Sequence, residues 1–272
     1  MTFTKPVFIC SALSLLLLAA CSHIGSDGEG RVVFEDRMTG NWQDNWFLDG
    51  EEATLNNSEK GLYFASGTIT KSDDREKYHA HHAVLWTKQE FSGDILIRFD
   101  CTRVDRSSYG VNIIYVQAQG IGEPPYVEDI SEWRDIRAVP VMSKYFTYMN
   151  ALHISYNVGD PETVSYIRCR RYPKQPEKGI GFGDTAIPPD YDDEGAKMVP
   201  GKTFTIEVEK RGKILTFRTL DYETKELLKE CVWDTTNNPE KQTPRLIKEG
   251  RIGLRQMSTK QNIYKNFEVI QL

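Results

Sequence analysis

The stretch His81–Gln119, HHAVLWTKQEFSGDILIRFDCTRVDRSSYGVNIIYVQAQ, contains three runs in which apolar residues recur at alternate positions. The runs cover residues 83–88, 95–102 and 111–118. Successive side chains of a β-strand point to opposite faces, so this period of two predicts three strands with two distinct faces each. Turn-forming residues such as Gly93 and Gly110 lie between the runs. We therefore predict a three-stranded antiparallel meander at the centre of a sheet.

The second face of these strands carries an unusual set of side chains. Trp86, Arg98, Asn112, Tyr115 and Gln117 combine aromatic rings with hydrogen-bonding groups. A sheet face that meets plain solvent seldom holds this combination, whereas a site for a polar ligand such as a sugar needs it. We therefore expect a ligand to bind on one face of this sheet.

The remainder of the chain repeats the pattern of short alternating runs separated by glycine, proline and polar residues. Many short strands with almost no helix predict two packed antiparallel sheets with the core between them. Alternation at the two ends predicts that Val32–Glu35 pairs with Asn266–Ile270. Two long segments, 120–149 and 173–200, lack strand patterns, and loops of this length are usually functional. Further strands are expected at 31–34, 61–65, 152–156, 164–172, 203–210, 212–219, 227–232, 251–256 and 263–270.

The first 20 residues are expected to be an export signal and not part of the fold. Their apolar run follows Lys5 and is too short to span a bilayer comfortably. It ends in Leu18-Ala19-Ala20-Cys21, the pattern of a bacterial lipobox, so we expect a lipid anchor on Cys21. A plain secretory signal with a chance cysteine is the alternative. Because Ser22 and not Asp follows, we expect attachment to the outer membrane of a bacterial cell envelope, with residues 21–30 as a tether.

Composition limits the partners and cofactors of the protein. The formal net charge is −5, and no basic stripe is present, which argues against a nucleic-acid partner. Cys101, Cys169 and Cys231 lie in apolar strand runs, so buried free thiols are expected in preference to a disulfide. The sequence has no cysteine and histidine cluster with zinc spacing, so neither a metal nor another cofactor is expected. The Asp190–Glu194 run has enough carboxylates for a structural calcium ion, with a solvated acidic loop as the alternative.

Seven motifs resemble one known family. They are His82–Trp86, Gly93–Ile95, Asn112–Ala118, Tyr145-Phe146, Met149-Asn150, His153–Tyr156 and Tyr166–Tyr172. Together they resemble the YesU-like family over nearly the whole chain from Val32 onward. The resemblance implies a concanavalin A-like jelly roll, an all-β sandwich of two antiparallel sheets, in one domain over residues 31–272. Lectins, glycoside hydrolases and polysaccharide lyases share that fold, so the fold alone assigns no activity.

Two classes of function remain open, a carbohydrate-active enzyme and a non-catalytic glycan-binding protein, both with a polysaccharide or oligosaccharide as partner. Glycoside hydrolysis needs two carboxylates across the scissile bond, and the Glu-x-Asp-x-x-Glu motif common in jelly-roll hydrolases is absent from the sequence. A polysaccharide lyase needs a base, an acid and groups that neutralise a uronate carboxylate. The abundance of His, Tyr, Arg and amide side chains along the motifs favours a lyase among the enzymes. A glycan binder needs only aromatic platforms, such as Trp86 or Trp133, and a few polar contacts.

The expected site lies on the sheet face that carries Tyr115, with the segment 120–149 as its wall. Alternation places Tyr115 and Gln117 on one face, where they are expected to meet His153. His153 is the preferred catalytic base because histidine titrates near neutral pH; Tyr156 is its alternative, and Tyr115 is the third catalytic candidate. The expected substrate-binding residues are His82, Trp86, Asn112, Gln117, Trp133, Arg137, Tyr145, Asn150, Arg168 and Arg170.

We predict that Cys21 carries the membrane anchor. Mass spectrometry of the mature N-terminus should show a lipid-modified Cys21, because the lipobox ends at this residue. Cys21→Ala should release the protein from the membrane fraction. An unmodified mature N-terminus that starts at another residue would contradict the prediction.

Overall fold

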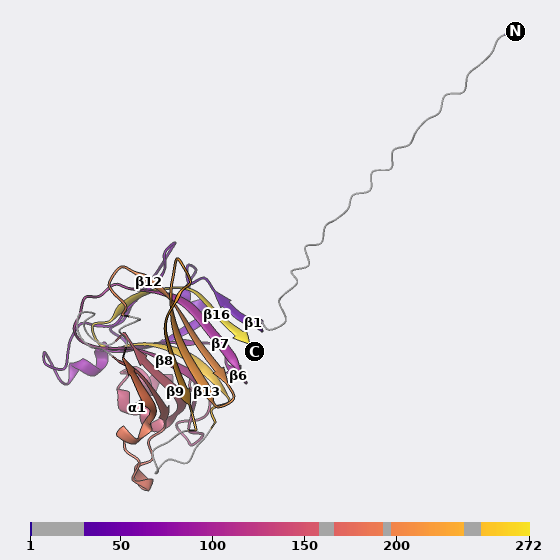
Figure 1. The fold of residues 1–272 in the computed structure, drawn as a ribbon. Coiled ribbons are helices and arrows are strands. Elements are labelled where there is room, and N and C mark those ends of the chain that lie inside the picture. Colours follow the sequence, from indigo (N-terminus) through magenta and orange to yellow (C-terminus); the bar gives the residue numbers. More distant parts are fainter. Residues whose placement is uncertain (2–29, 158–165, 193–196, 237–245) are drawn as a thin grey trace.

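The strands form two antiparallel sheets that face each other (Figure 1). This computed structural model describes residue 1 and residues 30–157, 166–192, 197–236 and 246–272. Sheet A contains, in spatial order, β14 (Leu227–Asp234), β13 (Ile214–Asp221), β12 (Thr203–Arg211), β7 (Ile95–Arg103), β16 (Gln261–Gln271), β4 (Gly61–Ala65) and β3 (Thr54–Ser58), with β1 (Arg31–Asp36) beside β16. Sheet B contains β11 (Ala186–Asp192), β10 (Tyr166–Tyr172), β9 (Met149–Tyr156), β8 (Asn112–Gly120), β15 (Glu249–Gln256), β5 (Ala83–Thr87) and β2 (Trp46–Asp49), with β6 (Phe91–Ser92) beside β15. The predicted all-β sandwich is confirmed.

Helical structure in the described residues is limited to short pieces. One α-helical segment, α1 (Met142–Tyr148), lies in the connection between β8 and β9. The 3₁₀ turns are η1 (Trp42–Asp44), η2 (Lys77–His81), η3 (Arg134–Arg137), η4 (Pro176–Lys178) and η5 (Gly183–Thr185). Within the same residues, no helix is long and apolar enough to cross a membrane.

The main core fills the space between the two sheets. Ile97 and Phe99 of β7 face Ile114 and Val116 of β8 across this space, and all four side chains are fully buried. Burial of each such side chain contributes roughly 1.5–3 kcal/mol relative to exposure. Alternate residues of the same strands point away from the core, which is why the sequence shows a period of two.

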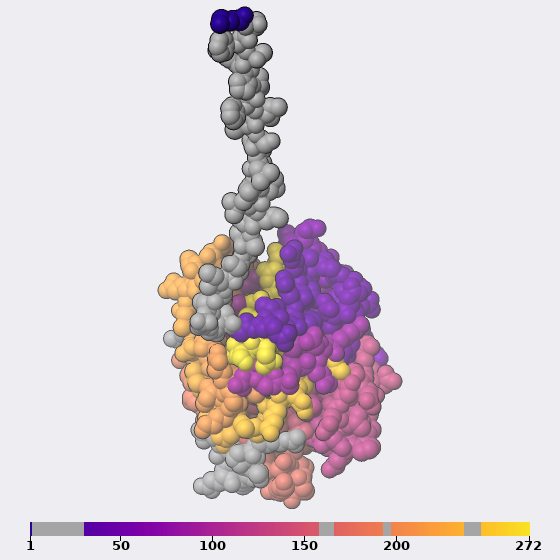
Figure 2. Space-filling model, turned by 90° about the vertical axis from the view of Figure 1, so that its right-hand side faces the viewer, coloured from indigo at the N-terminus to yellow at the C-terminus, as the bar shows by residue number. Residues whose placement is uncertain are grey.

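The two ends of the domain pair with each other, as the sequence predicted. β1 is antiparallel to β16, with Phe34 opposite Val269 and Glu35 opposite Glu268. Figure 2 shows the indigo N-terminal strand against the yellow C-terminal strand at the surface. The first and last strands therefore close the domain together.

The predicted central meander is wrong in its pairing, although its three strands exist. β7 lies in sheet A between β12 and β16, while β5 and β8 lie in sheet B with β15 between them. The chain crosses from one sheet to the other between these strands. Either sheet offers a strand one buried face, so alternation identifies a strand but does not decide its sheet.

The later strands show one confirmation and one difference. β12, β13 and β14 form the predicted second meander in sheet A. The segment 173–200, expected to be a loop, contains β11 at the edge of sheet B. Pro188 and Pro189 lie in this strand. An edge strand leaves the backbone N–H groups on one side without a partner strand, so proline is tolerated there.

The expected free thiols are present. Cys101, Cys169 and Cys231 are buried and unbonded to one another. Burial raises the pKa of each thiol, so all three remain protonated at neutral pH.

The face of sheet B that points away from sheet A is covered by the segment between β8 and β9, which contains η3 and α1. It buries a second apolar cluster, here called the second core. Trp86, Tyr115 and Tyr145 stack in it, with ring centroids 5.3 Å and 5.7 Å apart in successive pairs. Its buried members are Phe47, Val84, Trp86, Ile113, Tyr115, Ala118, Ile130, Trp133, Tyr145, Met149, Ala151 and Tyr172.

The buried carboxylate of Asp49 ties the second core together. One of its oxygens accepts hydrogen bonds from Trp86 Nε1 at 2.7 Å, Arg137 Nε at 2.7 Å and the Tyr145 hydroxyl at 2.9 Å. Arg137 is itself fully buried and lies over the ring of Trp133 at 4.2 Å. A buried ion pair is favourable only when its remaining polar atoms are also hydrogen-bonded. Asp49 meets this condition and fastens the covering segment to sheet B.

We predict that Asp49→Ala lowers the free energy of unfolding by about 3–5 kcal/mol, because it leaves the Arg137 guanidinium buried without a counterion. Urea unfolding followed by tryptophan fluorescence measures the change. Asp44→Ala, at an exposed position of η1, is the matched control and should change stability by no more than about 0.5 kcal/mol. Equal stabilities of the two variants would show that apolar packing alone holds the segment.

Candidate functional site

A part of the outer face of sheet B that the covering segment leaves accessible lies over β9 and β10. Tyr115 of β8 is opposite His153 of β9, and His153 is opposite Arg170 of β10. In the next row, Ile113 is opposite Ser155, and Ser155 is opposite Arg168. The structure therefore places Tyr115, His153, Arg168 and Arg170 on one face, as strand alternation predicted.

A hollow of about 140 Å³ lies over these two rows and is here called the His153 pocket. Its walls come from three strands, from α1 and from the segment that follows β10. The lining residues are Val111, Ile113, Met142, His153, Ser155, Tyr166, Arg168, Arg170, Phe182 and Met257. The volume is below the roughly 300–1,000 Å³ typical of pockets that enclose drug-sized ligands. One sugar residue or one substituent fits, and the rest of a longer chain would lie outside.

His153 is the most deeply buried polar group of the pocket. Only 3% of the residue is exposed, its Nδ1 lies 2.5 Å from the hydroxyl of Tyr172, and its Nε2 has no hydrogen-bond partner. Burial, and then the charges of Arg170 and Arg255, hold the pKa of His153 well below its usual range, so the ring is neutral. Burial also raises the pKa of Tyr172, which keeps its proton. We assign Tyr172 as the donor to Nδ1, which leaves an N–H on Nε2.

The two arginines of the pocket are oriented by aromatic rings. Arg168 lies 3.7 Å over the ring of Tyr166, and its Nε is 2.7 Å from the carboxylate of Asp190. Arg170 lies 4.2 Å over the ring of Phe182 and donates to the carbonyl of that residue at 3.0 Å. Stacking holds each guanidinium flat while its remaining N–H groups stay available to a ligand.

Three residues predicted to bind substrate belong to the second core, and a fourth, Arg137, packs against it. Trp86, Trp133, Arg137 and Tyr145 are each at most 3% exposed and bond to Asp49 or to their own segment. A sugar cannot reach them while the covering segment is in place. The segment 120–149 is therefore packed onto most of the sheet face and does not form the wall of an open groove, so these four assignments are corrected.

Three further assignments fail because the side chains point elsewhere. Gln117 sits at a β-bulge with φ of 51° and donates to the carbonyls of Phe91 and Gly93, so it leaves the face of Tyr115. Asn112 and Tyr156 point toward sheet A. Asn112 bonds to other buried amides at the end of the main core, and Tyr156 packs against main-core aromatic residues.

The last two predicted residues lie apart from the His153 pocket. His82 is fully buried and accepts a hydrogen bond from the backbone N–H of Ser258 at 2.9 Å. Asn150 donates to the carbonyl of Gly120 at 2.9 Å and borders a separate hollow of about 600 Å³ beside Tyr148 and Lys174. Neither position fits a direct role at the His153 pocket.

Several lining residues were not predicted from the sequence. Ser155 and Tyr166 could have been found, since alternation puts them on the same face as His153 and Arg168. Phe182 comes from an irregular segment, where no periodic pattern indicates which side chain reaches the pocket. Met142 and Met257 resemble ordinary core residues in the sequence.

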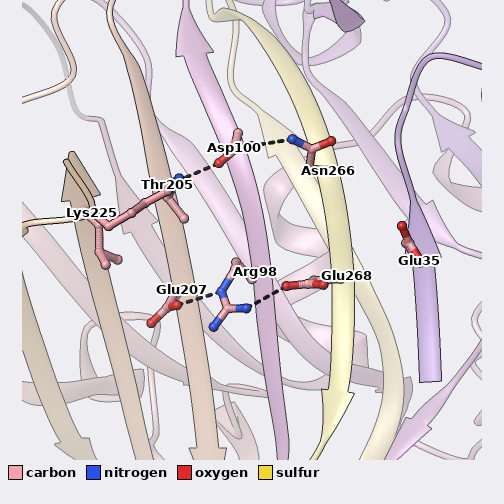
Figure 3. A pocket seen from close by; sticks show the side chains of 9 residues that line it. Glu35, Arg98, Asp100, Thr205, Glu207, Lys225, Asn266 and Glu268 are labelled. Atoms are coloured by element: carbon pink, nitrogen blue, oxygen red, sulfur yellow. Dashed lines mark hydrogen bonds and ion pairs between the residues drawn. The ribbon is translucent and has the colours of Figure 1, made fainter. Parts of the chain in front are cut away.

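The outer face of sheet A holds a second polar hollow, of about 420 Å³, and Figure 3 shows its charges paired across strands. Arg98 lies between Glu207 at 2.7 Å and Glu268 at 2.8 Å. The carboxylate of Asp100 accepts hydrogen bonds from Thr205 and Asn266. These contacts join β12, β7 and β16, so this network acts mainly to hold the sheet together.

The predicted acidic calcium site is not supported by the described residues. Asp190 pairs with Arg168, and Asp192 pairs with Lys229 at 2.8 Å. Residues 193–196 lie outside the described ranges. In the part of the chain that the structure describes, no three His, Cys, Asp or Glu side chains are grouped to hold a metal ion.

Comparisons with known proteins identify the class of fold. No family model matches the chain, and no curated protein matches it. A Bacillus subtilis protein of unknown function with a galectin-like fold matches with a TM-score of 0.65 at 16% identity, over 89% of this chain and 97% of that one. A legume lectin-like domain from Entamoeba histolytica matches with a TM-score of 0.56 at 6% identity, over 88% and 97%.

A third solved structure is the VIP36 exoplasmic/lumenal domain in its Ca²⁺/Man3GlcNAc-bound form, with a TM-score of 0.51 at 12% identity, over 88% of this chain and 90% of that one. At such identities the likeness establishes the fold alone. The domain is thus a lectin-like jelly roll.

The buried histidines predict how stability depends on pH. Burial, and then the charge of Arg255, lowers the pKa of His82 to about 2, and the pKa of His153 is also depressed. In the unfolded chain both titrate near 6.5, so protons favour the unfolded state below that pH. This contribution to stability should be complete only about one pH unit above 6.5, and it should fall by about 1.4 kcal/mol per histidine between pH 7.5 and 5.5.

Urea unfolding at several pH values measures this loss in the free energy of unfolding. His82→Gln should remove the part of the loss that comes from His82, because glutamine does not titrate. Glutamine can still accept the hydrogen bond from Ser258. An unchanged pH dependence in His82→Gln would contradict the predicted pKa shift.

Proposed function

We propose that the protein is a glycan-binding protein and that the His153 pocket is its binding site. The observation that carries the proposal is the pairing of apolar walls with convergent donors. Met257 and Phe182 offer surface for the C–H groups of a sugar ring, while His153 and Arg170 offer N–H groups to its oxygens. Sugar sites combine these two kinds of surface. The lectin-like fold supports the proposal only as a scaffold that tolerates many functions.

The polysaccharide lyase favoured by the sequence becomes the second candidate. The rings of His153 and Tyr115 are 5.7 Å apart, but Tyr115, the expected third catalytic residue, is fully buried in the second core and does not line the His153 pocket. A general base works best when its pKa is near the working pH. Burial raises the pKa of Tyr115 to about 12, and the pKa of His153 is depressed. Both pKa values thus lie far from neutral pH, which favours a binding site over a site that abstracts a proton.

We also propose that lipid on Cys21 attaches the protein to the bacterial outer membrane. The lipobox supports this, and Cys21 lies outside the described residues. Membership of the YesU-like family likewise remains a prediction from the sequence motifs. A tether of residues 21–30 would let the domain meet glycans near the membrane surface.

We predict that the purified protein binds at least one glycan in a panel of immobilised neutral and acidic polysaccharides. Phe182→Ala should weaken that binding about tenfold or more, since it removes an aromatic wall of the pocket. Leu227→Ala is the matched control, because it trims an exposed apolar side chain on sheet A.

Binding that Phe182→Ala leaves unchanged would place the site elsewhere, and no binding across the panel would refute the proposal. Release of unsaturated products from any panel member would instead establish the lyase.

A further inference from the structure

We propose that the His153 pocket binds the anionic group of an acidic saccharide, either the carboxylate of a uronate or a sulfate ester. The inference rests on the proposed function and specifies its ligand class. It depends on the chemistry of the groups that line the pocket and on two buried groups without partners.

The nitrogen groups of the pocket are all donors. His153 presents the Nε2 N–H, and Arg168 and Arg170 present guanidinium N–H groups, while the Ser155 hydroxyl donates to the carbonyl of Arg168. None of the described residues that line the pocket is Asp or Glu. Neutral sugar hydroxyls both donate and accept, so a site built for them supplies acceptors as well. A lining rich in donors matches a group that only accepts, which is a carboxylate or a sulfate.

The Nε2 atom of His153 marks where the acceptor would sit. His153 lines the pocket and is only 3% exposed, and its Nε2 has no hydrogen-bond partner among the described residues. A buried donor without an acceptor is unfavourable, and native structures seldom keep one without a reason. A ligand oxygen in the pocket would satisfy it.

The buried guanidinium of Arg255 adds positive charge beside the lining residues Ile113 and Met257. Arg255 is fully buried, its Nε donates to the sulfur of Met257, its Nη1 has no hydrogen-bond partner, and no carboxylate is in ion-pair contact with it among the described residues. It donates to the carbonyl of Pro140 at 2.6 Å and lies 4.5 Å over the ring of Tyr145. On the sheet it is opposite Ile113, a lining residue. An uncompensated charge in a low-dielectric setting attracts an anion.

The size of the hollow agrees with an anionic substituent. Its volume of about 140 Å³ admits one charged sugar residue and excludes a longer chain. Phe182 is 39% exposed, so its ring is accessible for contact with the residue that bears the charge or with its neighbour. Arg168 and Arg170 are two positions apart on β10 and can approach the same anion from one side.

The contrast with sheet A supports the same conclusion. On that sheet, Arg98 pairs with two carboxylates and Arg218 with three. On the outer face of sheet B, Arg168 has one half-exposed partner, Asp190, and Arg170 and Arg255 have hydrogen-bond partners but no carboxylate in ion-pair contact among the described residues. The excess of positive charge is thus local to the pocket.

Calorimetric titration of the intact protein with three probes tests the inference. The first probe is a disaccharide that contains glucuronate, and the second is the methyl ester of that glucuronate. The third is the corresponding disaccharide in which glucose replaces glucuronate and carries a sulfate group. The methyl ester keeps the shape of the uronate and removes its charge. We expect at least one of the two anionic probes to bind tenfold or more tightly than the ester, with affinity that falls as salt rises. The tighter of the two identifies a carboxylate or a sulfate as the natural group.

Two variants locate the effect. Arg170→Gln and His153→Gln should each reduce the anion preference to about twofold or less, because each removes a donor that the anion needs more than the uncharged methyl ester does. Arg211→Gln is the control, since it removes one exposed positive charge on sheet A. It should keep the full preference. Circular dichroism of each variant verifies that the fold is retained, and Arg170→Gln, at a half-buried position, serves if His153→Gln does not fold.

If neither anionic probe binds more tightly than the methyl ester, or if the preference survives Arg170→Gln, the anionic ligand class is overturned. Such results are distinct from failure of the proposed function, which would show as absence of binding across the whole glycan panel. A glycan bound through Phe182 without any charge preference would thus retain the binding site and reject only the acidic saccharide.

Discussion

The carboxylate of Asp49 is the contact on which the accessible surface of this domain depends. It lies at the end of β2, buried, and collects hydrogen bonds from Trp86 on the sheet and from Arg137 and Tyr145 on the covering segment. Because a buried charge needs all of these donors, the segment is held in one place on sheet B. The second core then fills most of the outer face of sheet B.

What remains open is the His153 pocket, and its chemistry follows from that covering. The segment excludes water from His153 and Arg255, which leaves a neutral imidazole and an uncompensated guanidinium close to the same hollow. On sheet A the charged residues stay near solvent and pair across neighbouring strands (Figure 3). Arginines therefore join neighbouring strands on sheet A, whereas on sheet B they are available to bind a ligand.

The lectin-like fold fits this division of roles. Solved structures with TM-scores of 0.65 and 0.56 share the sandwich at 16% and 6% identity, so many sequences can build these two sheets. The sheets require only one apolar face per strand, whereas a binding site requires particular side chains at particular rows. The function of this domain thus depends on the side chains of β8, β9 and β10 on sheet B and on the segments that border them.

Although it missed β2, β3, β6 and β11, the sequence by itself determined most of the longer strands, the sandwich, the pairing of the first and last strands and the shared face of Tyr115 and His153. Each of these follows from a period of two, which is a local property of the chain. Only the tertiary structure decided that β7 belongs to the other sheet, that a bulge turns Gln117 away, and that Arg137 and Trp133 are buried. These outcomes depend on contacts between residues far apart in the sequence, such as Asp49 with Arg137, and no local pattern records them.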